Sequence, residues 1–135
     1  MTAPLASAAA GTRAALWLGP DEWLLLAGED DGAAVEAALA AALAGLPHAL
    51  VDVSHRQDGL IVTGARAAWL LNAGVPIDLD PAAFPPGTAT RTLFHKAEIV
   101  LWRTDEDVFV LEAWRTFLPY VEGLLADAAL ELSAR

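Results

Sequence analysis

A strand–turn–strand pattern followed by a helix-forming segment occurs twice in this chain and constrains its fold more than any other feature. The segments 16–26 (LWLGPDEWLLL) and 101–111 (LWRTDEDVFVL) align without a gap, and each places an acidic turn between two apolar runs. Short apolar runs on either side of turn residues are typical of β-hairpins. The two segments are either a structural repeat or two ordinary acidic hairpins that each precede a helix.

The remaining segments alternate between strand-forming and helix-forming composition. The alanine-rich run 33–44 predicts a helix that Asp30 or Asp31 caps and that ends before Gly45 and Pro47. Further elements follow along the chain: strands over 49–55 and 58–63, a helix over 65–72, a proline-rich loop over 75–88, strands within 91–103, a hairpin over 98–112 and a last helix over 115–132. This order predicts an α+β fold. We expect a flexible arm over 1–13 and a single domain over 14–135.

Composition excludes several classes of partner. The chain has 135 residues, 56% of them apolar, which suits one folded domain with one core. Its formal net charge of −10 argues against binding to nucleic acid or to an anionic membrane. It has no cysteine, so disulfides and thiolate metal sites are absent, which fits a cytoplasmic location. We expect neither a signal peptide nor a membrane span, because no apolar run approaches the ~18 residues that suggest one.

The stretch DVSH, which ends at His55, looks at first like a catalytic group. If 49–55 is a strand, Asp52 and Ser54 share one face and His55 points to the other. A serine–histidine–aspartate relay needs the imidazole within hydrogen-bond reach of both partners, and neighbours on one strand do not provide this. We therefore interpret these residues as the end of a strand that leads into a turn at 56–58.

No other motif assembles an active site. The histidines, His48, His55 and His95, stand apart, and on a strand His95 and Lys96 would point to opposite faces. The glycines form neither a dinucleotide-binding motif nor a P-loop. The residues by themselves thus predict no catalytic, cofactor-binding or metal-binding group in this chain.

The five tryptophans are many for this length. Core packing explains some of them, and aromatic side chains are also enriched at protein interfaces. Trp23 follows an acidic turn, and Trp114 lies where a strand passes into a helix. We expect these two to be exposed and to contact a partner.

Much of the chain resembles a known family of folate-binding proteins, the aminomethyltransferase or T-protein family. The resembling segments are DVSH, GLIVTGARAAWLLNAG, PPGTATRTL and IVLWRTDEDVFVL. The C-terminal segment WRTFLPYVEGLLADAALEL, together with LGPDEWLLL near the start, is similar to the gamma-subunit family of heterotetrameric sarcosine oxidase. The resemblance covers nearly everything after residue 13.

The resemblance implies both a fold and a function. The fold implied is the ferredoxin-like βαββαβ module of the T-protein, with strand 23–27, helix 33–44, strands 49–55 and 58–63 and helix 65–72, extended by a C-terminal hairpin and helix. The function implied is that of a non-catalytic subunit, which assembles with alpha, beta and delta subunits. FAD, FMN, NAD, tetrahydrofolate and zinc would then belong to the other subunits, with none in this chain.

Two other functions stay open from the sequence. A stand-alone folate-dependent transferase would need a carboxylate in a deep pocket. The position of the family's catalytic aspartate, however, reads Asn72-Ala73 here, so only Asp78 or Asp52 could serve. The other possibility is a free-standing binding domain with an unrelated partner.

Overall fold

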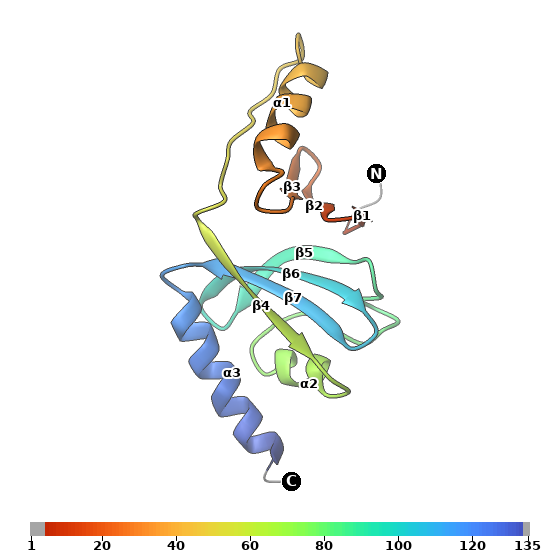
Figure 1. Ribbon diagram of the computed structural model, residues 1–135. Coiled ribbons are helices and arrows are strands. Elements are labelled where there is room, and N and C mark those ends of the chain that lie inside the picture. Colours follow the sequence, from red (N-terminus) through yellow and green to blue (C-terminus); the bar gives the residue numbers. More distant parts are fainter. Residues whose placement is uncertain (1–4, 134–135) are drawn as a thin grey trace.

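Two antiparallel sheets and three helices make up the fold, and the computed structural model describes residues 5–133 of it (Figure 1). The first sheet has the order β1-β2-β3, formed by β1 (Ser7–Ala10), β2 (Arg13–Gly19) and β3 (Glu22–Leu26). The second has the order β4-β7-β6-β5, formed by β4 (Gln57–Thr63), β5 (Ala89–Phe94), β6 (Ala97–Asp105) and β7 (Val108–Trp114). The helices are α1 (Gly32–Ala42), α2 (Ala67–Asn72) and α3 (Leu118–Ser133).

The α+β class, both hairpins, all three helices and the proline-rich loop are confirmed. Two residues, Pro20 and Asp21, connect β2 to β3, and two residues, Glu106 and Asp107, connect β6 to β7. Asp31 occupies the N-cap position of α1, as the sequence predicts, but its side chain makes no capping hydrogen bond. Its carboxylate instead pairs with Arg13 of β2.

The strand predicted over 49–55 is wrong, and the ferredoxin-like module is not confirmed. Residues 47–53 form no regular element, and residues 54–56 form a turn. The Asp52 side chain accepts a hydrogen bond from the Ser54 backbone N–H at 2.9 Å, and this local contact bends the chain away from an extended path. The segment instead connects α1 to β4, and the first hairpin belongs to a sheet of its own (Figure 1).

Two further expectations change near the hairpins. The predicted arm over 1–13 includes β1, which pairs with β2 from Ser7↔Leu16 to Ala10↔Arg13, so this part of it is ordered; residues 1–4 lie outside the described residues. His95 and Lys96 do not lie within a strand, because they form the tight turn between β5 and β6, with His95 at φ 50°.

The main core lies between the four-stranded sheet, α2, α3 and the proline-rich loop. Its fully buried members alternate along β6 and β7, as strands with one face on a core require. They include Ile99, Leu101, Phe109, Leu111, Val121 and Leu79. Gly74 comes just after α2 and lies against this core. A Cβ at this position would be 2.7 Å from the Phe94 ring, so the close packing depends on glycine.

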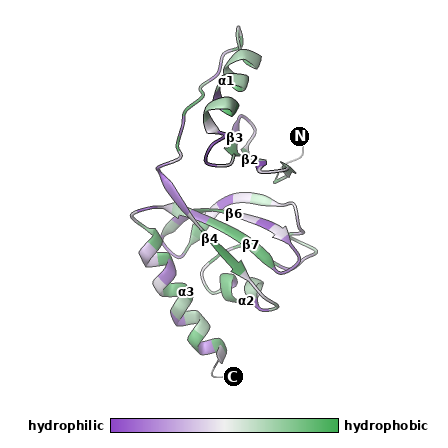
Figure 2. Cartoon of the chain, viewed as in Figure 1, coloured by the Kyte–Doolittle hydropathy of each residue, from purple (hydrophilic) through white to green (hydrophobic). Residues whose placement is uncertain are grey.

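A second, smaller core joins the two sheets. Leu16 and Leu24 of the first sheet pack with Ala89 and Val100 of the second. The Ser7 N–H donates to the Gly87 carbonyl at 2.8 Å, and the indole N–H of Trp102 donates to the Ser7 hydroxyl at 2.8 Å. The helix α1 lies on the far side of the first sheet from the second sheet (Figure 1). It is apolar along most of its length (Figure 2), yet none of its residues is buried.

Candidate functional site

The DVSH stretch forms an exposed turn rather than a catalytic group. Both the hydroxyl and the backbone N–H of Ser54 donate to Asp52 Oδ1. These two hydrogen bonds, chiefly the one from the hydroxyl, hold the pKa of Asp52 below its usual value. Asp52, Ser54 and His55 are all exposed to solvent, and the turn closes with the Arg56 N–H on the Val53 carbonyl at 2.9 Å. The arrangement stabilises a bend in the chain and provides no enclosed site.

Two of the histidines make local contacts. His48 Nδ1 lies 2.8 Å from the Leu46 carbonyl oxygen, and His95 packs edge-on against Phe94. Within residues 5–133, no three histidine or acidic side chains are grouped closely enough to hold a metal ion.

The residues around the place of the family's catalytic aspartate are also structural. Asn72 Nδ2 donates to the Ile77 carbonyl at 2.6 Å and so holds the start of the proline-rich loop against α2. Asp78 Oδ1 accepts the Asp80 backbone N–H at 2.9 Å. Asp78 is exposed, as is Asp52, so neither carboxylate lies in the deep pocket that a folate-dependent transferase would need.

A shallow depression lies where the start of α2 meets the end of α3. Its lining includes Ala65, Arg66, Trp69 and Leu132. Arg66 Nη1 donates to the Leu132 carbonyl at 3.0 Å, so this side chain ties the two helices together across the depression. The depression is open, and within residues 5–133 no acidic or histidine side chain lines it.

Arg103 is a buried structural group that sequence reasoning missed. It is only 2% exposed, and its guanidinium donates to four backbone carbonyls, those of Leu79, Phe84, Asp105 and Glu106. It also lies over the Phe109 ring, 4.8 Å from the centroid. Arg103 therefore binds the proline-rich loop to the β6–β7 turn. The signal was present in the sequence, because Arg103 continues the alternation of Ile99 and Leu101 along one strand face.

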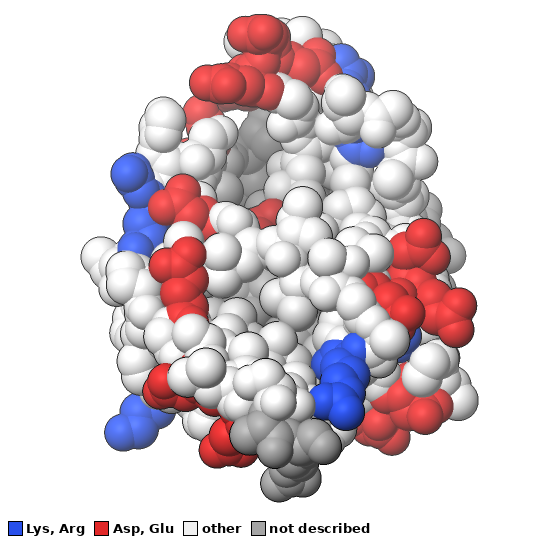
Figure 3. All heavy atoms as spheres, turned by 60° about the horizontal axis from the view of Figure 1, so that its bottom comes forward, with Lys and Arg blue, Asp and Glu red and all other residues white. Residues whose placement is uncertain are grey.

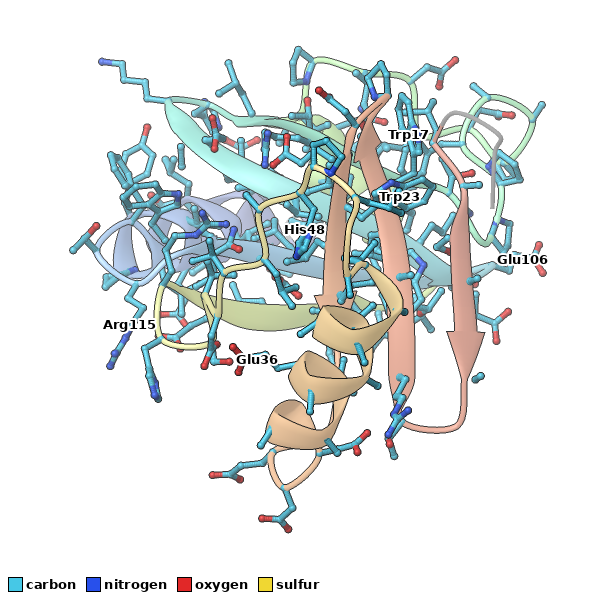
Figure 4. The ribbon with its side chains drawn as sticks, turned by 90° about the horizontal axis from the view of Figure 1, so that it is seen from above. Trp17, Trp23, Glu36, His48, Glu106 and Arg115 are labelled. Carbon is cyan, nitrogen blue, oxygen red and sulfur yellow. The ribbon has the colours of Figure 1, made fainter. Side chains whose placement is uncertain are left out.

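The tryptophans divide into half-buried ones, Trp17 and Trp102, and exposed ones. Trp23 is 39% exposed, Trp114 is 46% exposed and Trp69, which the sequence did not single out, is also 46% exposed. Trp17 pairs with Trp23 across β2 and β3, and the two rings lie together near one end of that hairpin (Figure 4). Both tryptophans proposed from the sequence as contact residues are thus accessible, and their role in binding stays a prediction.

No helix within residues 5–133 is long and apolar enough to cross a membrane. Charged groups are mostly at the surface. Acidic side chains are distributed around the face drawn in Figure 3, with a largely uncharged centre. Several arginines are engaged by carboxylates: Arg13 pairs with Asp31, and Arg91 pairs with Glu22 and Glu98.

Comparison with known proteins gives consistent matches. The family model described as "Sarcosine oxidase, gamma subunit family" matches residues 1–131. The sarcosine oxidase subunit gamma of an Arthrobacter species is 38% identical over 130 residues, which cover 96% of this chain and 63% of that protein. The subunit gamma of Corynebacterium sp. strain P-1 is 36% identical over 121 residues, which cover 90% of this chain and 59% of that protein.

A solved structure matches the fold over almost the whole chain. It is a chain of the heterotetrameric sarcosine oxidase from Corynebacterium sp. U-96, solved in complex with pyrrole 2-carboxylate. The match has a TM-score of 0.90 and 33% identity, and it covers 99% of this chain and 68% of that chain. The chain thus spans only about three fifths of the length of the two curated relatives. It belongs to the sarcosine oxidase gamma subunit family.

Proposed function

We propose that this chain works as the gamma subunit of a cytoplasmic heterotetrameric sarcosine oxidase, and that it contributes to assembly rather than to chemistry. The observation that carries the proposal is the structural match to a chain of the Corynebacterium heterotetramer, over 99% of this chain at a TM-score of 0.90. A match of that extent supports docking of the chain among the same kind of partners, the alpha, beta and delta subunits.

The reaction of such a complex needs several cofactors, which we place outside this chain. Sarcosine, dioxygen and tetrahydrofolate would give glycine, 5,10-methylenetetrahydrofolate and hydrogen peroxide. The methyl carbon passes to the folate, and two electrons with two protons pass to dioxygen. Flavin, nicotinamide, folate and zinc sites would belong to the other subunits. In this chain, Asp52, Ser54 and Asp78, the candidates for proton transfer weighed above, are exposed and held in turns, which supports an assembly role.

The free surface of this chain also supports an assembly role. Trp23 and Leu25 of β3 are each 39% exposed, on the face of the first sheet that does not pack on the second sheet. Trp114 is exposed at the end of β7. Exposed aromatic groups next to apolar ones are common where subunits meet. We therefore assign Trp23 and Trp114 to contacts with the other subunits.

Co-expression tests the proposal. The chain is produced alone and together with the alpha, beta and delta subunits of its own source, and each preparation is assayed for flavin absorbance and for sarcosine-dependent peroxide. We expect the chain alone to be colourless and inactive, and we expect it to co-purify with the other three subunits. Peroxide formation by the chain alone, transfer of a one-carbon unit to folate by the chain alone, or failure to co-purify would overturn the proposal.

The DVSH turn provides a sharper test of the non-catalytic role. Ser54→Ala and His55→Ala should each leave the turnover of the assembled complex nearly unchanged, because both side chains are exposed. Removal of a true acid–base group lowers turnover by ~10²-fold or more. A loss of that size, in a variant that assembles normally, would show that this turn takes part in the reaction.

A further inference from the structure

Two arginines and three aromatic side chains form an exposed patch where β7 passes into α3. This basic–aromatic patch consists of Arg56, Trp114, Arg115, Phe117 and Tyr120. Backbone hydrogen bonds hold it together: the Arg115 N–H donates to the Arg56 carbonyl at 3.2 Å, and the Phe117 N–H donates to the Trp114 carbonyl at 2.7 Å. The patch therefore has a fixed framework, although its side chains face solvent.

The aromatic part of the patch is unusually accessible for side chains of this size. Trp114 is 46% exposed, Phe117 is 45% exposed and Tyr120 is 39% exposed. Phe117 and Tyr120 contact each other edge to face, with ring centroids 6.5 Å apart. The group is therefore already ordered by its own contacts, so a partner would lose less entropy on binding it than on binding mobile side chains.

The guanidinium groups of the patch retain unused donors. Arg56 lies over Trp114, 5.8 Å from the ring centroid, and its one side-chain hydrogen bond within residues 5–133 is to Gln57 at 3.3 Å. No carboxylate in that part of the chain lies within 4.0 Å of it. Arg115 pairs with Asp58 at 3.5 Å, but both side chains are more than half exposed, and such pairs contribute little.

The positive charge of Arg56 and Arg115 indicates the chemistry of the partner. The chain carries a net charge of −10, so most of its surface repels acidic groups. Of the other surface arginines, Arg13 is paired with Asp31 and Arg91 with Glu22, and Arg66 donates to the Leu132 carbonyl. In the basic–aromatic patch, Arg56 has no carboxylate within 4.0 Å among residues 5–133, and Arg115 makes only long contacts of 3.5 Å with Asp58 and the His55 carbonyl. Figure 4 shows Arg115 extending away from the body of the molecule.

We infer that the basic–aromatic patch docks an acidic segment of a partner subunit, one that presents a carboxylate next to an apolar side chain. The carboxylate accepts hydrogen bonds from Arg56 and Arg115, and the apolar group packs on Trp114 and Phe117. Arginine and tryptophan at the centre of a contact typically contribute most of its binding energy. This inference rests on the proposed function, because it takes the partner to be a subunit of the same complex.

Matched substitutions test the location of the contact. Trp69 has the same exposure as Trp114, and Arg66 is exposed as Arg56 is, but both lie outside the patch. Each variant of this chain is co-expressed with the alpha, beta and delta subunits, and its retention on the purified complex is measured. Trp114→Ala and Arg56→Glu should lower retention by about 10-fold or more, while Trp69→Ala and Arg66→Glu should not. Equal losses in both pairs, or no loss in the first pair, would overturn the inference.

Thermal unfolding of each free variant separates lost binding from lost folding. Arg56→Glu changes an exposed side chain, so it remains a valid test even if Trp114→Ala unfolds. If the unsubstituted chain does not co-purify with the other subunits, the proposed function itself fails, which is a different result from a chain that binds regardless of the patch.

A cross-linking experiment tests the chemistry of the partner. A carbodiimide joins an amine directly to a carboxylate, so Arg56→Lys places a reactive amine at the patch. In the assembled complex we expect this variant to give a cross-linked peptide that joins position 56 to an aspartate or glutamate of another subunit. Arg66→Lys serves as the control and should give none. Absence of an inter-subunit cross-link from position 56, or an equal yield from position 66, would contradict an acidic partner.

Discussion

The two hairpins of this molecule share a backbone geometry but differ in how much of their surface the chain covers. In β2–β3, Gly19 pairs with Glu22, and the register shifts between Trp17 and Gly19. In β6–β7, Asp105 pairs with Val108, and the register shifts between Arg103 and Asp105. Each hairpin thus has a two-residue turn and an irregularity in the same place relative to it. The repeated pattern in the sequence therefore corresponds to a repeated hairpin.

The structural repeat is offset by one residue from the gapless sequence alignment. The gapless sequence alignment matches Leu16 with Leu101. An alignment by strand register instead matches Leu16 with Trp102. A shift of one residue along a strand turns every side chain to the opposite face. In structural register, Trp17 corresponds to Arg103 and Trp23 corresponds to Phe109. The similarity of the two sequences therefore predicts the hairpins correctly but does not show which of their faces correspond.

The corresponding faces of the two hairpins meet each other, and their other faces differ. Leu16 and Leu24 pack with Trp102 in the core between the sheets. On the other face of the second hairpin, Phe109 is completely buried against α3 and the proline-rich loop. The corresponding Trp23 of the first hairpin is 39% exposed. The second hairpin is the centre of a folded core, while the first leaves the side chains of Trp23 and Leu25 partly exposed on one face.

Substitution at the corresponding positions 109 and 23 gives the largest expected difference in the free energy of unfolding. Phe109→Ala should lower the free energy of unfolding by about 3–5 kcal/mol, because it opens a cavity in the main core. Trp23→Ala should lower it by about 1 kcal/mol or less, because much of that side chain remains in water. Urea unfolding of the free chain measures both. Similar losses would show that the first hairpin is packed as the second is.

Arg103 and Trp17 provide the next contrast. Arg103→Met removes the donor of two buried carbonyls, Leu79 and Phe84, and of two part-buried ones in the β6–β7 turn, so we expect a loss of about 3 kcal/mol in unfolding free energy. Trp17→Met, at the corresponding position of the first hairpin, is the control and should cost less because Trp17 is only half-buried. Urea midpoints decide between them. A larger loss from Trp17→Met would contradict the view that Arg103 fixes the proline-rich loop.

The helices that follow the two hairpins should also differ in their contribution to the free energy of unfolding, but by less than the hairpins do. Leu125 of α3 is buried, whereas Leu39 of α1 is only half-buried and α1 buries no residue. Leu125→Ala should cost about 2 kcal/mol, and Leu39→Ala about 1 kcal/mol or less. Hydrogen exchange offers a second measurement: amides of α1 should exchange faster than those in the middle of α3. Equal protection would mean that α1 is held more firmly than its burial indicates.

Local periodicity explains which parts of the fold were predictable from the sequence. The hairpins, helices and proline-rich loop have strong local signals, and all were predicted. Residues 49–55 have strand-like composition, but the Asp52–Ser54 hydrogen bonds compete with an extended path. The opposite error occurs at β1, where Ser7–Ala10 has no apolar alternation and is a strand only because β2 pairs with it. Pairing with a distant segment leaves no trace in local composition.

The candidate contact residues show a similar limit. Placement beside a turn or a strand end correctly predicted that Trp23 and Trp114 would be exposed. The exposure of Trp69 was not predicted, because a tryptophan within a short apolar helix gives no sign of which face it occupies. Arg103 was predicted only as part of a strand, since its acceptors come from a loop about twenty residues earlier and from its own turn. Such partners become neighbours only in the folded chain.

The smallest effect concerns Glu112, which occupies the position that corresponds to Leu26 in the first hairpin. Leu26 packs in the core between the sheets, whereas Glu112 is a half-buried carboxyl beside Gly59. Burial raises the pKa of Glu112, and the positive charge of Arg56 offsets this only in part. Because the folded state then holds this proton more tightly than the unfolded state does, raising the pH through the folded-state pKa lowers stability.

Glu112→Gln removes this cost and should therefore slightly stabilise the chain at pH 7. The gain should shrink as the pH falls and disappear below about pH 4, where glutamate is protonated in the unfolded state as well. Urea midpoints of the variant and the unsubstituted chain, measured from pH 7 down to pH 4, follow the difference. Glu122→Gln on the exposed surface of α3 is the control and should show a smaller difference at pH 7. If Glu112→Gln instead destabilises the chain at pH 7, attraction to Arg56 outweighs burial, and charge stabilises the second hairpin at the position where apolar packing of Leu26 stabilises the first.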